Sequence, residues 1–119
     1  MKLDELIKKL KALSDPTRLK ILLLLDIRPC CVCELTQFLK LPQPTLSHHI
    51  QKLHQANLIE VKKIKNYQIY SFKKNDETQK LVKLILSFFT EKDPETLKLI
   101  KKVKNSPPLY PREFIASNK

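Results

Sequence analysis

A mainly α-helical fold with one small β-hairpin is predicted by two observations on the sequence. Apolar residues recur at helical spacing in four stretches before residue 57 and in two more after residue 76. Between Ile59 and Phe72 apolar and polar residues mostly alternate instead, which is typical of two short strands. The length of 119 residues suits a single domain with one apolar core.

The first two helices are expected over residues 3–13 and 16–26. In the first, leucine and isoleucine side chains share one face and lysines cover the other. Ser14 and Asp15 before Pro16 form the pattern of a helix start, because a polar side chain caps the helix and proline at the first helical position loses no hydrogen bond. The stretch LKILLLL is apolar nearly all round, so the second helix is expected at the centre of the core.

Two further helices follow each other closely. CVCELTQFLK predicts a short helix over residues 31–40, and TLSHHIQKLHQAN predicts another over residues 45–57. In the second of these, Leu46, Ile50 and Leu53 share one face, which is expected to face the core. Because only LPQP separates the two, the sequence predicts a helix-turn-helix.

The segment from Ile59 to Phe72 predicts a hairpin, with an interruption near Lys65 and Asn66 that marks its tip. The chain contains no glycine. Asparagine tolerates the left-handed backbone conformation best after glycine. Asn57 at a helix end and Asn66 at the hairpin tip are therefore expected to adopt it.

The C-terminal part predicts a helix over residues 76–92 with a broad apolar face, which needs a partner surface. Asp93 and Pro94 predict the start of a lysine-rich helix that extends to about Lys104. The tail SPPLYPREFIASNK has three prolines and no periodicity, so it is expected to be extended, either docked or disordered. The broad face comprises Leu81, Val82, Leu84, Ile85, Phe88 and Phe89.

The charge of the chain is +11 and is concentrated in its middle third, where residues 35–75 contain seven lysines and one acid, Glu60. Such a balance favours an anionic partner: nucleic acid, acidic lipid or acidic protein. The longest apolar run, Ile21 to Leu25, is far shorter than the roughly 20 residues of a membrane span, and the N-terminus lacks a signal-peptide pattern. A cytoplasmic protein with no membrane partner is expected.

The outer face of helix 45–57 carries hydrogen-bonding side chains and no acids, and the hairpin tip beside it is basic. An ordinary solvated face is the alternative for the helix alone, but the combination with a basic hairpin favours DNA binding. His48 is expected to point outward, His49 to be packed and hydrogen-bonded, and His54 to be either. The residues expected to contact DNA are Gln43, Thr45, Ser47, His48, Gln51, Lys52, Lys62, Lys63 and Lys65.

All the cysteines of the chain lie in the segment RPCCVCEL, as Cys30, Cys31 and Cys33. An odd number in a reducing compartment argues against a structural disulfide and favours metal binding or thiol chemistry. Thiolates are soft ligands that suit zinc, cadmium, lead, copper(I) and trivalent arsenic or antimony, and three of them suit a three-coordinate ion. A cysteine that only fills the core is the alternative.

Helix geometry restricts a site made of these thiols. In a regular helix Cys31 and Cys33 lie about 200° apart and cannot bind one ion, whereas Cys30 and Cys33 share a face. Binding by all three therefore requires an extended or distorted helix start, which Pro29 permits.

The runs LSDPTRLKILLLL, CVCEL, LPQPTLSHHIQKLHQANLI and YQIYSF resemble, in this order, the ArsR/SmtB family of winged-helix metal-sensing repressors over about residues 5 to 75. The resemblance implies a homodimer that pairs through its first and last helices, binds operator DNA and releases it on binding metal. It also implies that Cys31 and Cys33, which match the family's cysteine pair, bind arsenite, antimonite, cadmium or lead. Thr36 replaces a further cysteine of the arsenic pattern, so Cys30 is expected to supply the third thiolate.

We therefore expect a winged helix-turn-helix repressor that senses As(III) or Sb(III), or else Cd(II), Pb(II) or Zn(II), through its three cysteines. Residues 1–92 are expected to form the DNA-binding and dimerisation domain, and residues 93–119 a C-terminal helix and tail that extend it. The alternatives are a redox or persulfide sensor that binds DNA, and a thiolate metal-binding adaptor that does not. An enzyme is not expected, because no carboxylate pair, nucleophile with a base or glycine-rich phosphate loop is present.

Overall fold

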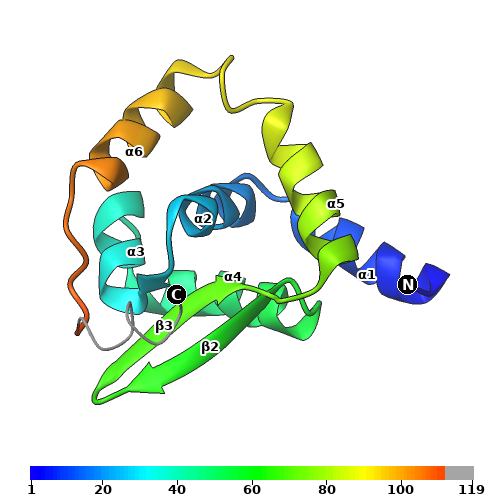
Figure 1. Ribbon diagram of the computed structural model, residues 1–119, viewed down its shortest axis with the longest axis horizontal. Coiled ribbons are helices and arrows are strands. Elements are labelled where there is room, and N and C mark those ends of the chain that lie inside the picture. The colour runs from blue at the N-terminus through cyan, green and yellow to red at the C-terminus, as the bar shows by residue number, and fades with distance from the viewer. Residues whose placement is uncertain (112–119) are drawn as a thin grey trace.

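The computed structural model is drawn in Figure 1. It describes residues 1–111, which contain six helices and a sheet of three strands. The predicted mainly helical fold with a small β-hairpin is confirmed. The elements in chain order are α1 (Leu3–Leu13), α2 (Pro16–Ile27), β1 (Cys30–Cys31), α3 (Val32–Leu39), α4 (Gln43–Gln55), β2 (Ile59–Ile64), β3 (Tyr67–Phe72), α5 (Asp76–Ser87) and α6 (Pro94–Lys104).

Helix α2 is the centre of the core, as predicted. Residues 21–25 are all buried, and the helix packs against α4, α5, α6 and β3. Asp15 caps it: the carboxylate Oδ1 accepts hydrogen bonds from the backbone N–H groups of Thr17 at 2.8 Å and Arg18 at 3.1 Å. Burial alone would raise the pKa of Asp15, but these bonds and the Arg18 charge together lower it.

Helices α3 and α4 form the predicted helix-turn-helix. Leu46, Ile50 and Leu53 are buried, so the opposite face of α4 points outward. Lys40 in the turn between the two helices adopts the left-handed conformation with φ 55°, which the sequence analysis did not predict.

The other left-handed positions agree with the prediction in one case and differ in the other. Asn57 has φ 57°, as expected. At the hairpin tip Lys65 is left-handed, with φ 55°, so the prediction for Asn66 is wrong. The loop between the two strands has two residues, and a positive φ at only the first of them is the pattern of a type II′ turn.

The three strands form one antiparallel sheet in the order β1-β3-β2. β2 and β3 form the predicted hairpin. β1 was not predicted, because a strand of two residues is too short to show a period. Its two residues pair with the middle of β3, Cys30 opposite Tyr70 and Cys31 opposite Ile69. The third helix consequently begins one residue later than expected, at Val32.

Helix α5 is shorter than predicted, since it ends at Ser87 instead of Lys92. The backbone N–H groups of Phe88 and Phe89 bond to carbonyls three residues earlier, which tightens and ends the helix. Helix α6 has the predicted range and packs on α2 and α3. The following residues 105–111 are docked, and the rest of the predicted tail lies outside the described residues. No helix within residues 1–111 is long and apolar enough to cross a membrane.

Candidate functional site

The nine residues expected to contact DNA are all exposed. Six belong to α4, and the three lysines lie on β2 and at the hairpin tip. Among the histidines, His48 and His54 are exposed. His49 is half-buried, and its Nδ1 lies 3.3 Å from Nη1 of Arg18, which agrees with the packed position expected for it.

A hollow lies between α4 and the sheet. Gln43, Ser47 and Gln51 line it on the helix side, and Val61 and Gln68 line it on the hairpin side. Helix and hairpin thus form one surface on which polar side chains are arranged on both sides of a depression. Such a surface suits a DNA duplex, whose bases are read by a helix and whose phosphates are contacted by the flanking elements.

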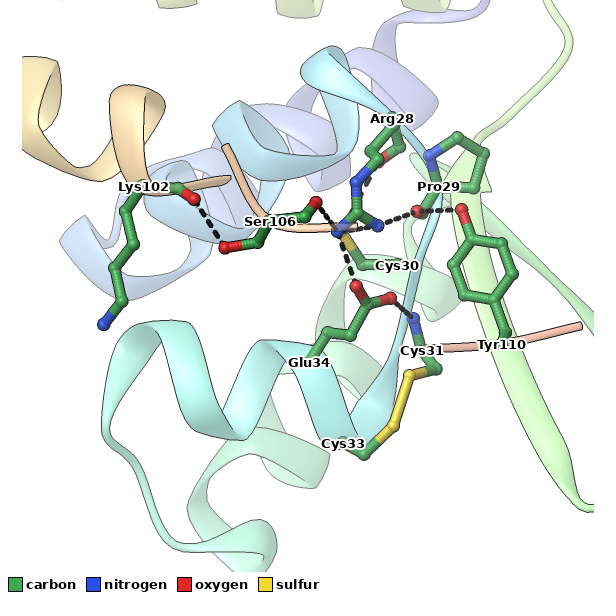
Figure 2. A network of polar contacts seen from close by, with 9 residues as sticks. All are labelled: Arg28, Pro29, Cys30, Cys31, Cys33, Glu34, Lys102, Ser106 and Tyr110. Carbon is green, nitrogen blue, oxygen red and sulfur yellow. Dashed lines mark hydrogen bonds and ion pairs between the residues drawn. A yellow bond between two sulfur atoms is a disulfide. The ribbon is translucent and has the colours of Figure 1, made fainter. Parts of the chain in front are cut away.

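The start of α3 brings Cys31 and Cys33 together. Cys31 precedes the helix with an extended backbone, φ −82° and ψ 163°, whereas Cys33 is in the first turn. Their Sγ atoms are joined in a disulfide, and their Cα atoms are 5.4 Å apart (Figure 2). The extended start that a shared site requires is therefore present, whereas the bond between the two sulfurs was not predicted, because the sequence analysis argued only about a structural disulfide. A bond across so short a loop restricts the unfolded chain little, so it is not a scaffold.

Cys30 points away from this pair, because neighbouring residues of a strand place their side chains on opposite faces. It lies in the main core, whereas Cys31 packs with Ile69 and Tyr110 in a separate cluster. Burial and the negative charge of Glu34 raise the pKa of Cys30 to about 12, although Arg28 acts in the opposite direction. The structure therefore does not bring the three thiols together. Within residues 1–111 no three His, Cys, Asp or Glu side chains could hold a metal ion.

An ion pair between Arg28 and Glu34 fixes the start of α3 (Figure 2). Arg28 Nη2 donates to Glu34 Oε2 at 2.6 Å, and Glu34 Oε1 accepts from the backbone N–H of Cys31 at 3.1 Å. The Glu34 side chain is 1% exposed. Burial lowers the pKa of Arg28, but the contact with Glu34 and the nearby Cys30 and Tyr110 raise it by more.

Sequence reasoning missed Arg28, Glu34 and Tyr110. A signal for Glu34 was present, because an acid three residues after a helix cap is half of a capping box, with Cys31 in the cap position. Nothing local in the sequence indicates Tyr110, which reaches this region from 81 residues away to bond to Pro29.

A second hollow joins the thiol pair, Cys31 and Cys33, to the DNA-facing residues. The thiol pair lines it together with Gln43 at the start of α4 and with Lys63 and Asn66 of the hairpin. Cys33 is exposed, whereas Cys31 is 1% exposed. A group bound to the thiol pair therefore lies beside both elements that are expected to contact DNA.

Comparison with known proteins identifies relatives of this chain. Residues 15–61 match the family described as bacterial regulatory protein, arsR family. Over 70 residues the chain is 43% identical to the arsenical resistance operon repressor of Staphylococcus xylosus, which covers 59% of this chain and 67% of that protein. Over 76 residues it is 40% identical to an HTH-type transcriptional regulator of Methanocaldococcus jannaschii, which covers 63% of this chain and 84% of the other.

A solved structure shares the fold. The homodimeric winged helix-turn-helix DNA-binding domain Mb0332 of Mycobacterium bovis superposes with a TM-score of 0.68 at 26% identity. The superposition covers 75% of this chain and 82% of that domain. The predicted winged helix-turn-helix fold is thereby confirmed.

The different surroundings of the thiols predict different reactivity. In the reduced protein at about pH 8, iodoacetamide is expected to alkylate Cys33 on the order of a hundredfold faster than Cys30, because only the thiolate reacts and burial keeps Cys30 protonated. Peptide mass spectrometry after timed quenching measures both rates. In urea the two rates are expected to converge. Equal rates in the native protein would show that Cys30 is not sealed in the core.

Proposed function

Because the chain belongs to the ArsR family of bacterial regulatory proteins, we propose that it is a homodimeric repressor that releases operator DNA when trivalent arsenic or antimony binds Cys31 and Cys33. As a member of this family it is a DNA-binding transcriptional regulator and not an enzyme. The observation that carries the proposal is the hollow that the thiol pair shares with Gln43 and Lys63.

In the DNA complex, α4 enters the major groove and the hairpin contacts the backbone beside it. Gln43, Gln51 and His48 reach base edges, since amide and imidazole side chains donate and accept hydrogen bonds there. The hydroxyls of Thr45 and Ser47 bind phosphates. The lysines Lys52, Lys62, Lys63 and Lys65 do the same and supply most of the salt-dependent affinity. The exposure of all nine side chains supports this assignment.

The chemistry of the thiol pair favours As(III) or Sb(III) as the inducer. Both are soft and bind sulfur strongly. The pair supplies two sulfurs, and a small ligand from solution takes the third position, because Cys30 is a neutral thiol in the core. Zn(II) is less suited because it requires four ligands. Cd(II) and Pb(II) are further inducers to test. The similarity to the arsenical resistance operon repressor of S. xylosus supports the metalloid.

Inducer and DNA are coupled through the start of α3. A dithiol reductant first opens the disulfide, giving two thiols while it is itself oxidised to a disulfide. One ion bound to both sulfurs then fixes their spacing and so shifts the first turn of the helix. Because α3 packs on α4 and the pair shares a hollow with Gln43, this shift displaces the DNA-reading helix. A coupling free energy of about 1–3 kcal/mol is typical of two such sites.

Homodimer formation is supported by exposed apolar side chains on two adjacent helices. On α1, Leu3 is 74% exposed, and just beyond α5, Phe88 is 63% exposed. The Met1 amino group lies 3.0 Å from Glu77 Oε2, so the starts of α1 and α5 lie close together. Exposed apolar surface of this kind favours a protein partner, and the M. bovis domain is described as homodimeric.

Redox sensing is a second candidate function, which the disulfide between Cys31 and Cys33 favours. A peroxide would take two electrons and two protons from the two thiols and become two waters, or an alcohol and one water, while the two sulfurs form the disulfide. Release of DNA by peroxide or polysulfide in metal-free buffer, without any response to arsenite, would support this function over metalloid sensing.

Substitutions on the DNA-facing surface separate base contacts from phosphate contacts. Lys63→Ala is expected to weaken binding to all sequences alike and to reduce the slope of log affinity against log salt by about 1. Gln51→Ala is expected to weaken the free energy of binding to the operator by about 1–3 kcal/mol and to leave binding to other sequences unchanged. Fluorescence anisotropy with an operator selected from random DNA measures both, and Lys101→Ala on α6 is the control. If Lys101→Ala weakens binding as much as Lys63→Ala, the assigned surface is wrong.

Arsenite is expected to weaken operator binding by the reduced protein by about 5- to 150-fold. Cys31→Ser and Cys33→Ser each remove a sulfur of the pair and are expected to abolish this response, whereas Cys30→Ala is expected to retain it. Titration of labelled operator at fixed arsenite concentration provides the measurement. An arsenite response that persists in the Cys31→Ser, Cys33→Ser double variant contradicts the proposal.

Charge placed on the exposed apolar faces is expected to dissociate the dimer. Phe88→Glu introduces a carboxylate that must be desolvated on association, so it is expected to raise the dimer dissociation constant by at least about tenfold. Leu97→Glu, on the exposed side of α6, is the matched control and is expected to have no effect. Sedimentation velocity over a range of concentrations distinguishes the two. A wild-type chain that sediments as a monomer at all concentrations would exclude the homodimer.

A further inference from the structure

The segment that follows α6 lies across the residues that precede the thiol pair (Figure 2). We refer to residues 105–111 as the strap. Arg28 Nη2 donates to the backbone carbonyl of Ser106 at 3.4 Å, and the Tyr110 hydroxyl donates to the carbonyl of Pro29 at 2.8 Å. The strap is thus attached to the chain immediately before β1.

Tyr110 is the buried residue of the strap, and it belongs to the same apolar cluster as Cys31. It is 6% exposed and packs in one cluster with Cys31 and Ile69, and Ile64 and Tyr67 of the hairpin complete that cluster. Cys31 is buried within this cluster, whereas Cys33 is exposed. The two sulfurs of the pair therefore differ in access, and Tyr110 contributes to the cover over the less accessible one.

Arg28 connects the strap to the start of α3. Its guanidinium carbon lies 5.9 Å from the centre of the Tyr110 ring, at a distance where a cation and an aromatic face attract each other. The same guanidinium bonds to Glu34, whose carboxylate holds the backbone N–H of Cys31. Movement of the strap is therefore transmitted to the residue that begins the helix.

We propose that Tyr110 is a positioning residue for the thiol pair: it covers Cys31, so that an incoming metalloid binds Cys33 first and reaches Cys31 only when the strap moves away. This inference rests on the proposed function. The exchange starts from the protein with its disulfide reduced to two thiols. In each step a sulfur replaces one hydroxide of As(OH)₃, and the thiol proton leaves with that hydroxide as water. The first exchange needs no movement of the strap, and the second does.

The docked strap consequently opposes inducer binding. The strap docks on the free form of Cys31 and must move away for the metalloid-bound form. The free energy of strap docking is therefore subtracted from the free energy of inducer binding. Weakening the strap is expected to raise both the rate and the affinity of arsenite binding, without any change in the ligand atoms.

Alkylation of the reduced, full-length protein tests the cover directly. In Tyr110→Ala, N-ethylmaleimide is expected to modify Cys31 on the order of tenfold faster than in the wild type, with Cys33 unchanged. Tyr110→Phe keeps the ring and loses only the bond to Pro29, so an intermediate rate is expected. Leu109→Ala, which truncates an exposed neighbour in the strap, is the control and is expected to react as the wild type does.

Arsenite binding then tests the consequence for the inducer. In stopped-flow absorbance of the arsenic–thiolate bonds, the wild type is expected to show a fast and a slow phase, and Tyr110→Ala is expected to accelerate only the slow one. Operator affinity without arsenite verifies that each variant is folded.

The outcomes separate this inference from the proposed function. One outcome is faster labelling of Cys31 in Tyr110→Ala with no release of DNA by arsenite in any variant. It would support the inference that Tyr110 covers Cys31 and reject the metalloid function. The other outcome is release of DNA by arsenite in the wild type, with Cys31 labelling and the slow phase both unchanged in Tyr110→Ala and Tyr110→Phe. It overturns the inference about Tyr110.

Discussion

The ion pair between Arg28 and Glu34 is the contact on which the geometry of the candidate sensor depends. It joins the end of α2 to the first turn of α3 across β1, and the carboxylate also holds the backbone N–H of Cys31. With Glu34 almost fully buried, removal of Arg28 would leave an uncompensated buried charge, which costs about 3–5 kcal/mol. So large a cost keeps β1 extended and fixes where α3 begins.

That constraint separates the Cys30 thiol from the pair formed by Cys31 and Cys33. Because Cys30 and Cys31 are neighbours in an extended strand, only one of them can face the exposed Cys33. Cys30 is in the apolar core, where it stays protonated, and the thiol pair borders the hollow beside the hairpin and the start of α4, with only Cys33 exposed. The thiol pair therefore lies on the side of the helix-turn-helix that is expected to contact DNA. A small displacement of the pair would act directly on the residues proposed to bind the operator.

The sequence predicted the parts of the molecule that follow from periodicity. Leu46, Ile50 and Leu53 indicated the buried face of α4, and Asp15 with Pro16 indicated the start of α2. It did not predict β1, because two residues show no period, nor the left-handed Lys65, because the turn type is set by how the strands pair. The separation of Cys30 from the other two thiols could not be predicted either, because it depends on the pairing of β1 with β3. The position of the strap depends on the contact of Tyr110 with Pro29, which is far away in the sequence.

X-ray absorption at the arsenic edge tests the central claim most directly, since it counts the sulfur atoms bound to the metalloid. The reduced protein would be loaded with one equivalent of arsenite in a buffer whose reductant contains no sulfur. Two sulfur neighbours are predicted for the wild type, with the same number in the Cys30→Ala variant. Three sulfurs in the wild type and two in Cys30→Ala would contradict the account, because Cys30 would then have left the core to complete the site.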